Sequence, residues 1–195
     1  MSQRKSDTLK TYADLMEASG LLMEAALYGQ EETHPDVLTY DSREVKANTM
    51  FICKGAAFKE TYLVSAIEKG AVLYISERKY ETGKDVPFLL VSDIRKAMAI
   101  LANAFYGSPW KELTVVGVGG TKSTSAYYMK AIVDDYMEET GKPESAVISS
   151  IDIYDGKSRV ESHITTPEAV ELQRQFRNAA DCGITFAEME VSSQE

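Results

Sequence analysis

A chain of 195 residues, of which 44% are hydrophobic, is long enough for one large domain or two small ones with packed cores. Its formal net charge of −9 argues against broad binding to nucleic acid or to an anionic membrane surface. No apolar run is long enough to span a membrane, and the basic N-terminus lacks the hydrophobic core of a secretory signal, so we expect a cytoplasmic protein. Two isolated cysteines, Cys53 and Cys182, fit reduced thiols in a protein core.

Strands and helices alternate through the first half of the sequence. Ser6 or Asp7 is expected to cap a first helix that ends at Gly20. The segment 21–29 is ambiguous. Beyond it, the hydrophobic patterns predict strands at 37–43 (running into a turn), 49–54, 71–77 and 87–92, and helices at 59–69 and 93–106.

A break at Ser108-Pro109-Trp110 interrupts this alternation, and we place a domain boundary there, with domains at 1–108 and 109–195. The second domain is expected to hold strands at 113–118, 146–149 and 184–192, helices at 123–139 and 166–183 (with Pro167 in its first turn), and a hairpin turn at Asp155-Gly156. Alternating strands and helices imply an α/β fold.

The stretch 113–125, LTVVGVGGTKSTS, is typical of a buried strand, a glycine-rich turn and a helix start. Such a turn favours anionic oxygens, Lys122 would meet a phosphate, and a Ser or Thr hydroxyl would hold Mg²⁺. The stretch departs from the phosphate-loop pattern G-x-x-x-x-G-K-[ST], because no glycine stands directly before Lys122 and the loop is short. A tight turn without a ligand is the alternative.

Four segments in this order resemble the Mur ligases, most closely those of the MurE type. They are YDSR at 40–43 with the stretch 49–72, LTVVGVGGTKSTSAYYMKAI at 113–132, SHITTPEAVELQ at 162–173 and EMEVSSQ at 188–194. Ligases of the MurE type add the third amino acid to the UDP-N-acetylmuramoyl dipeptide of peptidoglycan.

The resemblance implies a UDP-substrate-binding α/β domain at 1–108 and the beginning of a P-loop-type, parallel-sheet ATPase domain at 109–195. The family has a third domain as well, so this chain is interpreted as truncated, and a second chain is one candidate partner that would supply the missing domains. The family's loop reads G-T-[NK]-G-K-[ST]-[ST], and the loop of this chain is two residues shorter.

The resemblance implies ATP and Mg²⁺ as cofactors. The residues that would line the nucleotide are Gly117, Gly119, Gly120, Thr121, Lys122, Ser123 and Thr124. Lys122 would act in catalysis by neutralising phosphate charge. The alternative for Lys122 is a solvated lysine at a helix start.

The magnesium ligands implied by the resemblance are the hydroxyl of Ser123 and the carboxylate of Glu190. Glu190 stands near the C-terminal end of the last predicted strand, where α/β sheets bind ligands, and Mg²⁺ accepts a few carboxylates together with phosphate and water. Glu188 lies on the same face of that strand and is the alternative ligand. If neither binds metal, both are surface acids on an edge strand.

Four residues are expected to bind the UDP-substrate by the same resemblance: Ser42, Thr165, Thr166 and Ser192. Without the family match, Ser42 belongs to an ordinary Asp-Ser-Arg turn, and the two threonines are helix caps ahead of Pro167.

The leading hypothesis is therefore ATP-dependent amide ligation in peptidoglycan precursor synthesis, with a UDP-N-acetylmuramoyl dipeptide and an amino acid as substrates. We expect the chain alone to be inactive. A non-catalytic, UDP-substrate-binding fragment is the alternative. An unrelated P-loop kinase is disfavoured, because the other three segments would then be coincidences.

Overall fold

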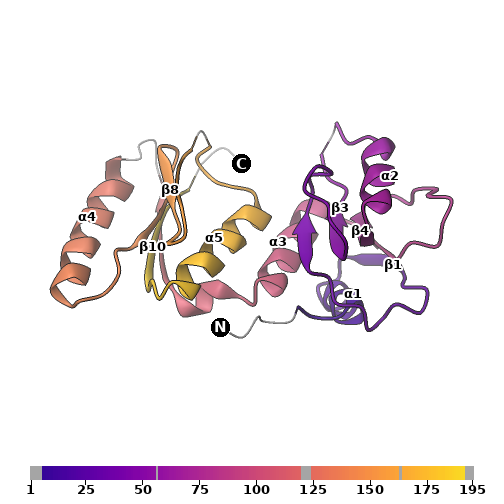
Figure 1. The fold of residues 1–195 in the computed structure, drawn as a ribbon, viewed down its shortest axis with the longest axis horizontal. Coiled ribbons are helices and arrows are strands. Elements are labelled where there is room, and N and C mark those ends of the chain that lie inside the picture. The colour runs from indigo at the N-terminus through magenta and orange to yellow at the C-terminus, as the bar shows by residue number, and fades with distance from the viewer. Residues whose placement is uncertain (1–5, 56, 120–123, 163, 192–195) are drawn as a thin grey trace. The chain divides into compact units, whose positions relative to one another are not determined.

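The computed structural model describes residues 6–55, 57–119, 124–162 and 164–191. They form two compact units, Met1–Phe105 and Tyr106–Glu195, each of which is described by itself (Figure 1). Each unit holds a five-stranded sheet and helices, so the predicted α/β class is confirmed. The assignment of separate substrate-binding and ATP-binding roles to 1–108 and 109–195 stays a prediction. No helix of the described residues is long and apolar enough to cross a membrane.

The sheet of the first unit is mostly parallel, with the strand order β1-β5-β4-β3-β2. Its strands are β1 (Leu22–Ala26), β2 (Val37–Thr39), β3 (Thr49–Ile52), β4 (Ala71–Ser76) and β5 (Phe88–Val91). The ambiguous segment 21–29 thus contains β1, which pairs antiparallel to β5 at one edge. Because β1 is largely exposed to solvent, its residues do not need the apolar alternation that marks a buried strand.

Three helices accompany this sheet: α1 (Leu9–Ala18), α2 (Glu60–Glu68) and α3 (Ile94–Phe105). The cap of α1 is Thr8, whose hydroxyl accepts a hydrogen bond from the N–H of Thr11 at 3.2 Å. The expected caps Ser6 and Asp7 are therefore wrong by one or two residues. Thr8 makes the same kind of contact, because a β-branched hydroxyl residue also caps helices well.

Aromatic and aliphatic side chains share the core on one face of this sheet. Phe51, Tyr74 and Phe88 come from adjacent strands, and the rings of Tyr74 and Phe88 stack with centroids 5.6 Å apart. Cys53 lies in this core, and burial raises the pKa of its thiol. Cys182 in the second unit is exposed, so the expectation of a core thiol holds for Cys53 and is wrong for Cys182.

The sheet of the second unit has the strand order β6-β10-β7-β8-β9. Its strands are β6 (Thr114–Gly119), β7 (Ala146–Ile148), β8 (Asp152–Tyr154), β9 (Arg159–Glu161) and β10 (Phe186–Val191). β6, β10 and β7 run parallel, whereas β8 and β9 form an antiparallel hairpin. Gly156 in the hairpin turn has a φ of +83°, and a Cβ there would lie 2.8 Å from the Cβ of Cys182.

Strand β6 does not occupy the central, buried position that its β-branched residues predicted. It forms one edge of the described sheet, and its residues are partly or fully exposed. β10 takes the inner position between β6 and β7, so the alternative that Glu188 and Glu190 are surface acids on an edge strand is wrong.

Helices α4 (Thr124–Glu139) and α5 (Ala169–Asp181) flank this sheet on opposite sides (Figure 1). The start of α4 agrees with the predicted start of the helix after the glycine-rich turn. In α5, Glu168 is the N-cap, so Pro167 precedes the cap instead of lying in the first turn. A short 3₁₀-helix, η1 (Pro109–Glu112), precedes β6, and Glu112 binds Arg177 of α5 through two hydrogen bonds of 2.7 and 2.9 Å.

Candidate functional site

The carboxyl ends of β6, β10 and β7 meet at one edge of the second sheet. In open α/β sheets, ligands bind in the crevice outside this edge. Gly119, the last residue of β6, is in register with Val191 of β10. The beginning of the predicted phosphate loop therefore lies beside the end of the acidic strand, and this edge is the candidate site.

Glu190 stands at this edge with its carboxylate held in place. Its Oε2 accepts hydrogen bonds from the backbone N–H and from the hydroxyl of Ser150, both at 3.0 Å. The hydroxyl of Thr166 donates to the carbonyl oxygen of Glu190 at 3.4 Å. The side chain is buried. Ser150 thus holds the carboxylate of Glu190, and Thr166 holds its backbone.

Glu188 lies on the same face of β10 and is fully buried. Neither oxygen of its carboxylate has a hydrogen-bond partner within the residues that the structure describes. Burial raises the pKa of Glu188, and the nearby Ser145 hydroxyl and Lys130 ammonium oppose this shift. Glu188 is therefore poised to be neutral more readily than an exposed glutamate.

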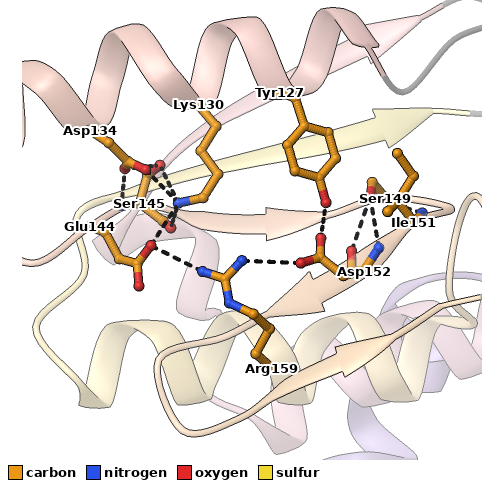
Figure 2. Close-up of polar contacts among 9 residues, drawn as sticks. All are labelled: Tyr127, Lys130, Asp134, Glu144, Ser145, Ser149, Ile151, Asp152 and Arg159. Atoms are coloured by element: carbon orange, nitrogen blue, oxygen red, sulfur yellow. Dashed lines mark hydrogen bonds and ion pairs between the residues drawn. The ribbon is translucent and has the colours of Figure 1, made fainter.

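A buried lysine of α4 joins this helix to Ser145, the residue directly before β7 (Figure 2). The Nζ of Lys130 donates to the carbonyl oxygen of Ser145 at 2.6 Å and to Asp134 at 2.7 Å, and it lies 3.3 Å from Glu144. Asp134 in turn accepts hydrogen bonds of 2.7 Å from the N–H and the hydroxyl of Ser145. Burial alone would raise the pKa of Asp134, but these hydrogen bonds outweigh it and lower the pKa.

A second polar group joins α4 to the hairpin (Figure 2). The hydroxyl of Tyr127 donates to a carboxylate oxygen of Asp152 in β8. Arg159 of β9 donates to the other oxygen of Asp152 at 3.1 Å and to Glu144 at 3.0 Å. The helix that follows the predicted phosphate loop is thus fastened to its sheet by charged and polar side chains.

The structure describes only part of the predicted nucleotide-binding segment. Gly117 and Gly119 belong to β6, and Thr124 is the exposed first residue of α4. Four predicted residues lie outside the described residues: Gly120, Thr121, Lys122 and Ser123. The proposed metal pair of Ser123 and Glu190 stays a prediction, and the structure describes only its second member.

Among the predicted substrate-binding residues, Thr165 and Thr166 precede α5 and are half-buried near β10, whereas Ser192 lies outside the described residues. Ser42 belongs to the first unit, in the turn after β2, where its carbonyl oxygen accepts a hydrogen bond of 2.6 Å from Lys69. Beside it, the Arg43 guanidinium holds the pKa of Asp41 at about 2.

Within the described part of the chain, no three His, Cys, Asp or Glu side chains gather in a way that could hold a metal ion. A cation at the candidate site would therefore depend on one or two carboxylates and on oxygens from a bound phosphate. This is the coordination that Mg²⁺ commonly uses at phosphate sites. Glu190 fits such a role, because its buried carboxylate is fixed at the ligand-binding edge.

Comparison with known proteins shows which proteins this chain is similar to. No family model matches the chain. The sequence is 40% identical over 194 residues to a UDP-N-acetylmuramyl-tripeptide synthetase of Lactobacillus acidophilus, covering 97% of this chain and 36% of that protein. It is 42% identical over 169 residues to the UDP-N-acetylmuramoyl-L-alanyl-D-glutamate–L-lysine ligase of Enterococcus faecalis, covering 85% of this chain and 30% of that protein.

This chain is a homologue of the Mur ligases. It spans about a third of the length of the curated relatives it matches. The fold agrees with that of a UDP-N-acetylmuramoyl-L-alanyl-D-glutamate–2,6-diaminopimelate ligase, with a TM-score of 0.65, 21% identity, and coverage of 92% of this chain and 36% of that one. A UDP-N-acetylmuramoylalanyl-D-glutamyl-2,6-diaminopimelate–D-alanyl-D-alanyl ligase of Acinetobacter baumannii gives a TM-score of 0.61 at 14% identity, covering all of this chain and 38% of that one. The resemblance to Mur ligases seen in the motifs is thus confirmed.

Several residues of the site were not predicted from the sequence. Ser150 binds Glu190, and its signal was a pair of serines directly after a buried strand. Lys130 and Asp134 stand four residues apart on one helix, which brings them to the same face. A spacing of this kind usually marks a solvated ion pair, so it did not suggest a buried cluster.

Proposed function

We propose that this chain forms the UDP-substrate-binding part and the beginning of the ATP-binding part of a ligase that adds an amino acid to a UDP-N-acetylmuramoyl dipeptide. The observation that carries the proposal is the position of Glu190. Its buried carboxylate is fixed by Ser150 at the carboxyl ends of the parallel strands, beside the start of the glycine-rich turn. The names of the homologous ligases support the choice of substrates.

In such a ligation the substrate carboxylate attacks the γ-phosphate of ATP, releasing ADP and forming an acyl phosphate. An amine then displaces phosphate to form the amide. The residues of this chain would bind and orient the phosphates: the glycines of the turn present backbone N–H groups, and Lys122 offers a positive charge. The start of α4 at Thr124 adds the N-terminal end of a helix, which favours anions.

Magnesium would be held by Glu190 and the Ser123 hydroxyl, and when bound it neutralises charge on the phosphate oxygens. Ser150 keeps the Glu190 carboxylate aimed at this edge of the sheet. The hydroxyl of Thr166 lies next to the same edge, and with Thr165 it would contact an anionic group of the UDP-substrate.

The test is calorimetric titration of the chain with ATP and Mg²⁺, because binding can be measured without turnover. Glu190→Gln keeps the volume and an oxygen that can accept from Ser150, but it removes the charge. We expect it to weaken Mg²⁺-dependent binding by about tenfold or more. Glu161→Gln, an exposed glutamate of β9, is the matched control and should bind as the unchanged chain does. Equal affinity of all three proteins would remove Glu190 from the site.

A second experiment addresses the short loop. Inserting Gly-Lys between Lys122 and Ser123 restores the loop length of the family. Because each charge-assisted hydrogen bond to phosphate contributes about 1.5–3 kcal/mol, the insertion should strengthen ATP binding at least about tenfold. Tight and equal binding by both forms would show that the short loop is not a damaged phosphate site.

The coverage of about a third of the homologous ligases favours a second candidate function for the chain alone. On this account it binds the UDP-substrate and carries out no ligation. Ser42→Ala should then weaken binding of a UDP-N-acetylmuramoyl dipeptide by about one to two decades if Ser42 contacts a charged group. An unchanged dissociation constant would exclude Ser42 from the substrate site.

A further inference from the structure

The turn between β7 and β8, residues 149–152, carries the serine that holds Glu190. At its two ends, the N–H and the hydroxyl of Ser149 donate to the carbonyl oxygen of Asp152 at 3.1 and 3.0 Å. The same hydroxyl accepts from the N–H groups of Ile151 and Asp152 at 3.1 and 3.2 Å. Because Ser149 is fully buried and joins both ends, a contact made at Asp152 is transmitted to the tip of the turn, where Ser150 lies.

The carboxylate of Asp152 fastens this turn to helix α4. Figure 2 shows Tyr127 and Arg159 both pointing towards this carboxylate. One oxygen accepts from the hydroxyl of Tyr127, and the other accepts from Arg159 at 3.1 Å. Burial and the hydrogen bond to Asp152 raise the pKa of Tyr127, so its hydroxyl stays a donor. Tyr127 lies in the first turn of α4, three residues after Thr124, at the end of the helix that follows the glycine-rich segment.

The tip of the turn reaches the acidic strand. The N–H and the hydroxyl of Ser150 both donate to Oε2 of Glu190 at 3.0 Å. Two donors on one charged oxygen make a directional contact, so the position of Ser150 sets the orientation of the carboxylate. A chain of hydrogen bonds therefore runs from the first turn of α4, through Asp152 and the turn, to Glu190.

We propose that Tyr127 and Asp152 are positioning residues for the Glu190 carboxylate. They hold the turn 149–152, and through Ser150 the carboxylate, at a fixed place relative to the start of α4. The group that this arrangement serves is a divalent cation bound to phosphate oxygens, so the inference rests on the proposed function. Residues that orient a metal ligand through hydrogen bonds affect metal affinity without contacting the metal.

The first measurement follows the Ser150 amide by NMR in the chain without ligand. Tyr127→Phe removes the hydroxyl and keeps the ring, so the Ser150 signal should shift and its amide should exchange with solvent about threefold faster or more. Tyr128→Phe, at the exposed neighbouring position, is the matched control. Thr140→Val is a second control, because it removes a hydroxyl that donates to Tyr136 at 2.9 Å just past the other end of α4. Both controls should leave the Ser150 amide unchanged.

The second measurement uses Mn²⁺ with an equal amount of ATP as the probe, because this ion broadens the NMR signals of nearby amides. The signals of Ser150 and Glu190 should broaden in the unchanged chain. Tyr127→Phe should need about threefold to tenfold more Mn²⁺–ATP for half of this broadening, since groups that touch a metal ligand directly contribute about 10–100-fold in affinity. Thr140→Val should need the same amount as the unchanged chain.

Asp152→Ala removes the acceptor on which Tyr127 acts, and it should have an effect at least as large as that of Tyr127→Phe. Combining the two substitutions should add nothing to the effect of Asp152→Ala alone, because the hydroxyl then has no carboxylate to bind. Additive effects would show that Tyr127 acts by another route and would overturn the inference.

The remaining outcomes separate this inference from the proposed function. A Ser150 amide that is unaffected by Tyr127→Phe, or one that Thr140→Val changes as much, would overturn the inference. Equal broadening of Tyr127→Phe and the unchanged chain at each Mn²⁺–ATP concentration would overturn it too, while the proposed function would stand. An unchanged chain in which Ser150 and Glu190 do not broaden would overturn the proposed function, and the role of Tyr127 and Asp152 in cation binding with it.

Discussion

Helices α4 and α5 cover opposite faces of one sheet and both bury apolar side chains, but of the two only α4 buries a charged one. α5 contributes Phe176 and Ala179 to an apolar cluster with Ile148 of β7 and Ala187 of β10. α4 buries Ala126 and Met137 together with Lys130, whose ammonium donates to Ser145 and lies near the buried carboxylate of Glu188. The α5 face is held by burial of apolar surface, and the α4 face combines apolar burial with hydrogen bonds of fixed direction.

The two kinds of contact have different consequences. Apolar packing stabilises a fold but tolerates small shifts, because it is not directional. A charge-assisted hydrogen-bond network fixes a helix in one position, but removal of one member leaves its partners unpaired. The polar face lies under the helix that begins at the candidate phosphate site. We therefore expect the α5 face to set the stability of this unit and the α4 face to set the position of the site.

The largest expected effect comes from the apolar face. Phe176→Ala removes an almost fully buried ring from the cluster and leaves a cavity, so it should lower the free energy of unfolding by about 3–5 kcal/mol. Tyr136→Ala removes an exposed ring of α4 and should change the free energy of unfolding by no more than about 0.5 kcal/mol. Denaturant unfolding measures both. A loss below about 1 kcal/mol for Phe176→Ala would show that this face does not set the stability.

The next effect tests the polar face. Lys130→Met removes the ammonium that joins Asp134 to the carbonyl oxygen of Ser145, and it leaves these acceptors without their buried donor. We expect a loss of about 2–4 kcal/mol, somewhat less than for Phe176→Ala, because Asp134 keeps its hydrogen bonds from Ser145 and is partly solvated. Lys142→Met at an exposed position is the control. If Lys130→Met were neutral, the polar cluster would not hold α4.

The sequence predicted the apolar face better than the polar one, for a physical reason. Buried strands such as β7 and the helix α5 follow from local patterns of apolar residues, which any core requires. The burial of Lys130 depends on Ser145, fifteen positions away, whose position relative to α4 follows only from the packed fold. A lysine in a helix is most often solvated, so its sequence context predicts the wrong environment.

The exposure of β6 could not be predicted from the sequence either. Its valines correctly predicted a strand, and the acidic strand was correctly predicted to carry Glu188 and Glu190 on one face, whereas the predicted turn lies outside the described residues. Which strand stands next to which is decided by pairing between distant segments. The spacing of residues along β6 contains no information on this point.

The third prediction separates the two faces by pH. The pKa of Asp134 is lowered in the folded chain, so this carboxylate stabilises the fold above its unfolded pKa of about 3.8, and the contribution is lost as the pH falls through the folded value. Asp134→Asn should therefore lower the free energy of unfolding at neutral pH. The difference in this free energy between the variant and the unchanged chain should shrink as the pH falls. The loss in free energy of unfolding caused by Phe176→Ala should stay nearly constant with pH, because this substitution removes no titrating group. Denaturant midpoints at a series of pH values give both differences, with exposed Asp135→Asn as the control.

The smallest expected effect concerns the outer end of the polar face. Tyr127→Phe removes the hydroxyl that donates to Asp152 and keeps the ring, so the packing of α4 is unchanged. Asp152 keeps its 3.1 Å hydrogen bond from Arg159, which limits the loss to about 0.5–1.5 kcal/mol in the free energy of unfolding.

In a double-mutant cycle, the effects of Tyr127→Phe and Phe176→Ala on the free energy of unfolding should add within about 0.5 kcal/mol, because they act on opposite faces of the sheet. Tyr127→Phe and Arg159→Gln should not add, because both donors serve the carboxylate of Asp152. If the cycle across the sheet showed strong coupling, the two faces would not be independent, and the separation of stability from helix position would fail.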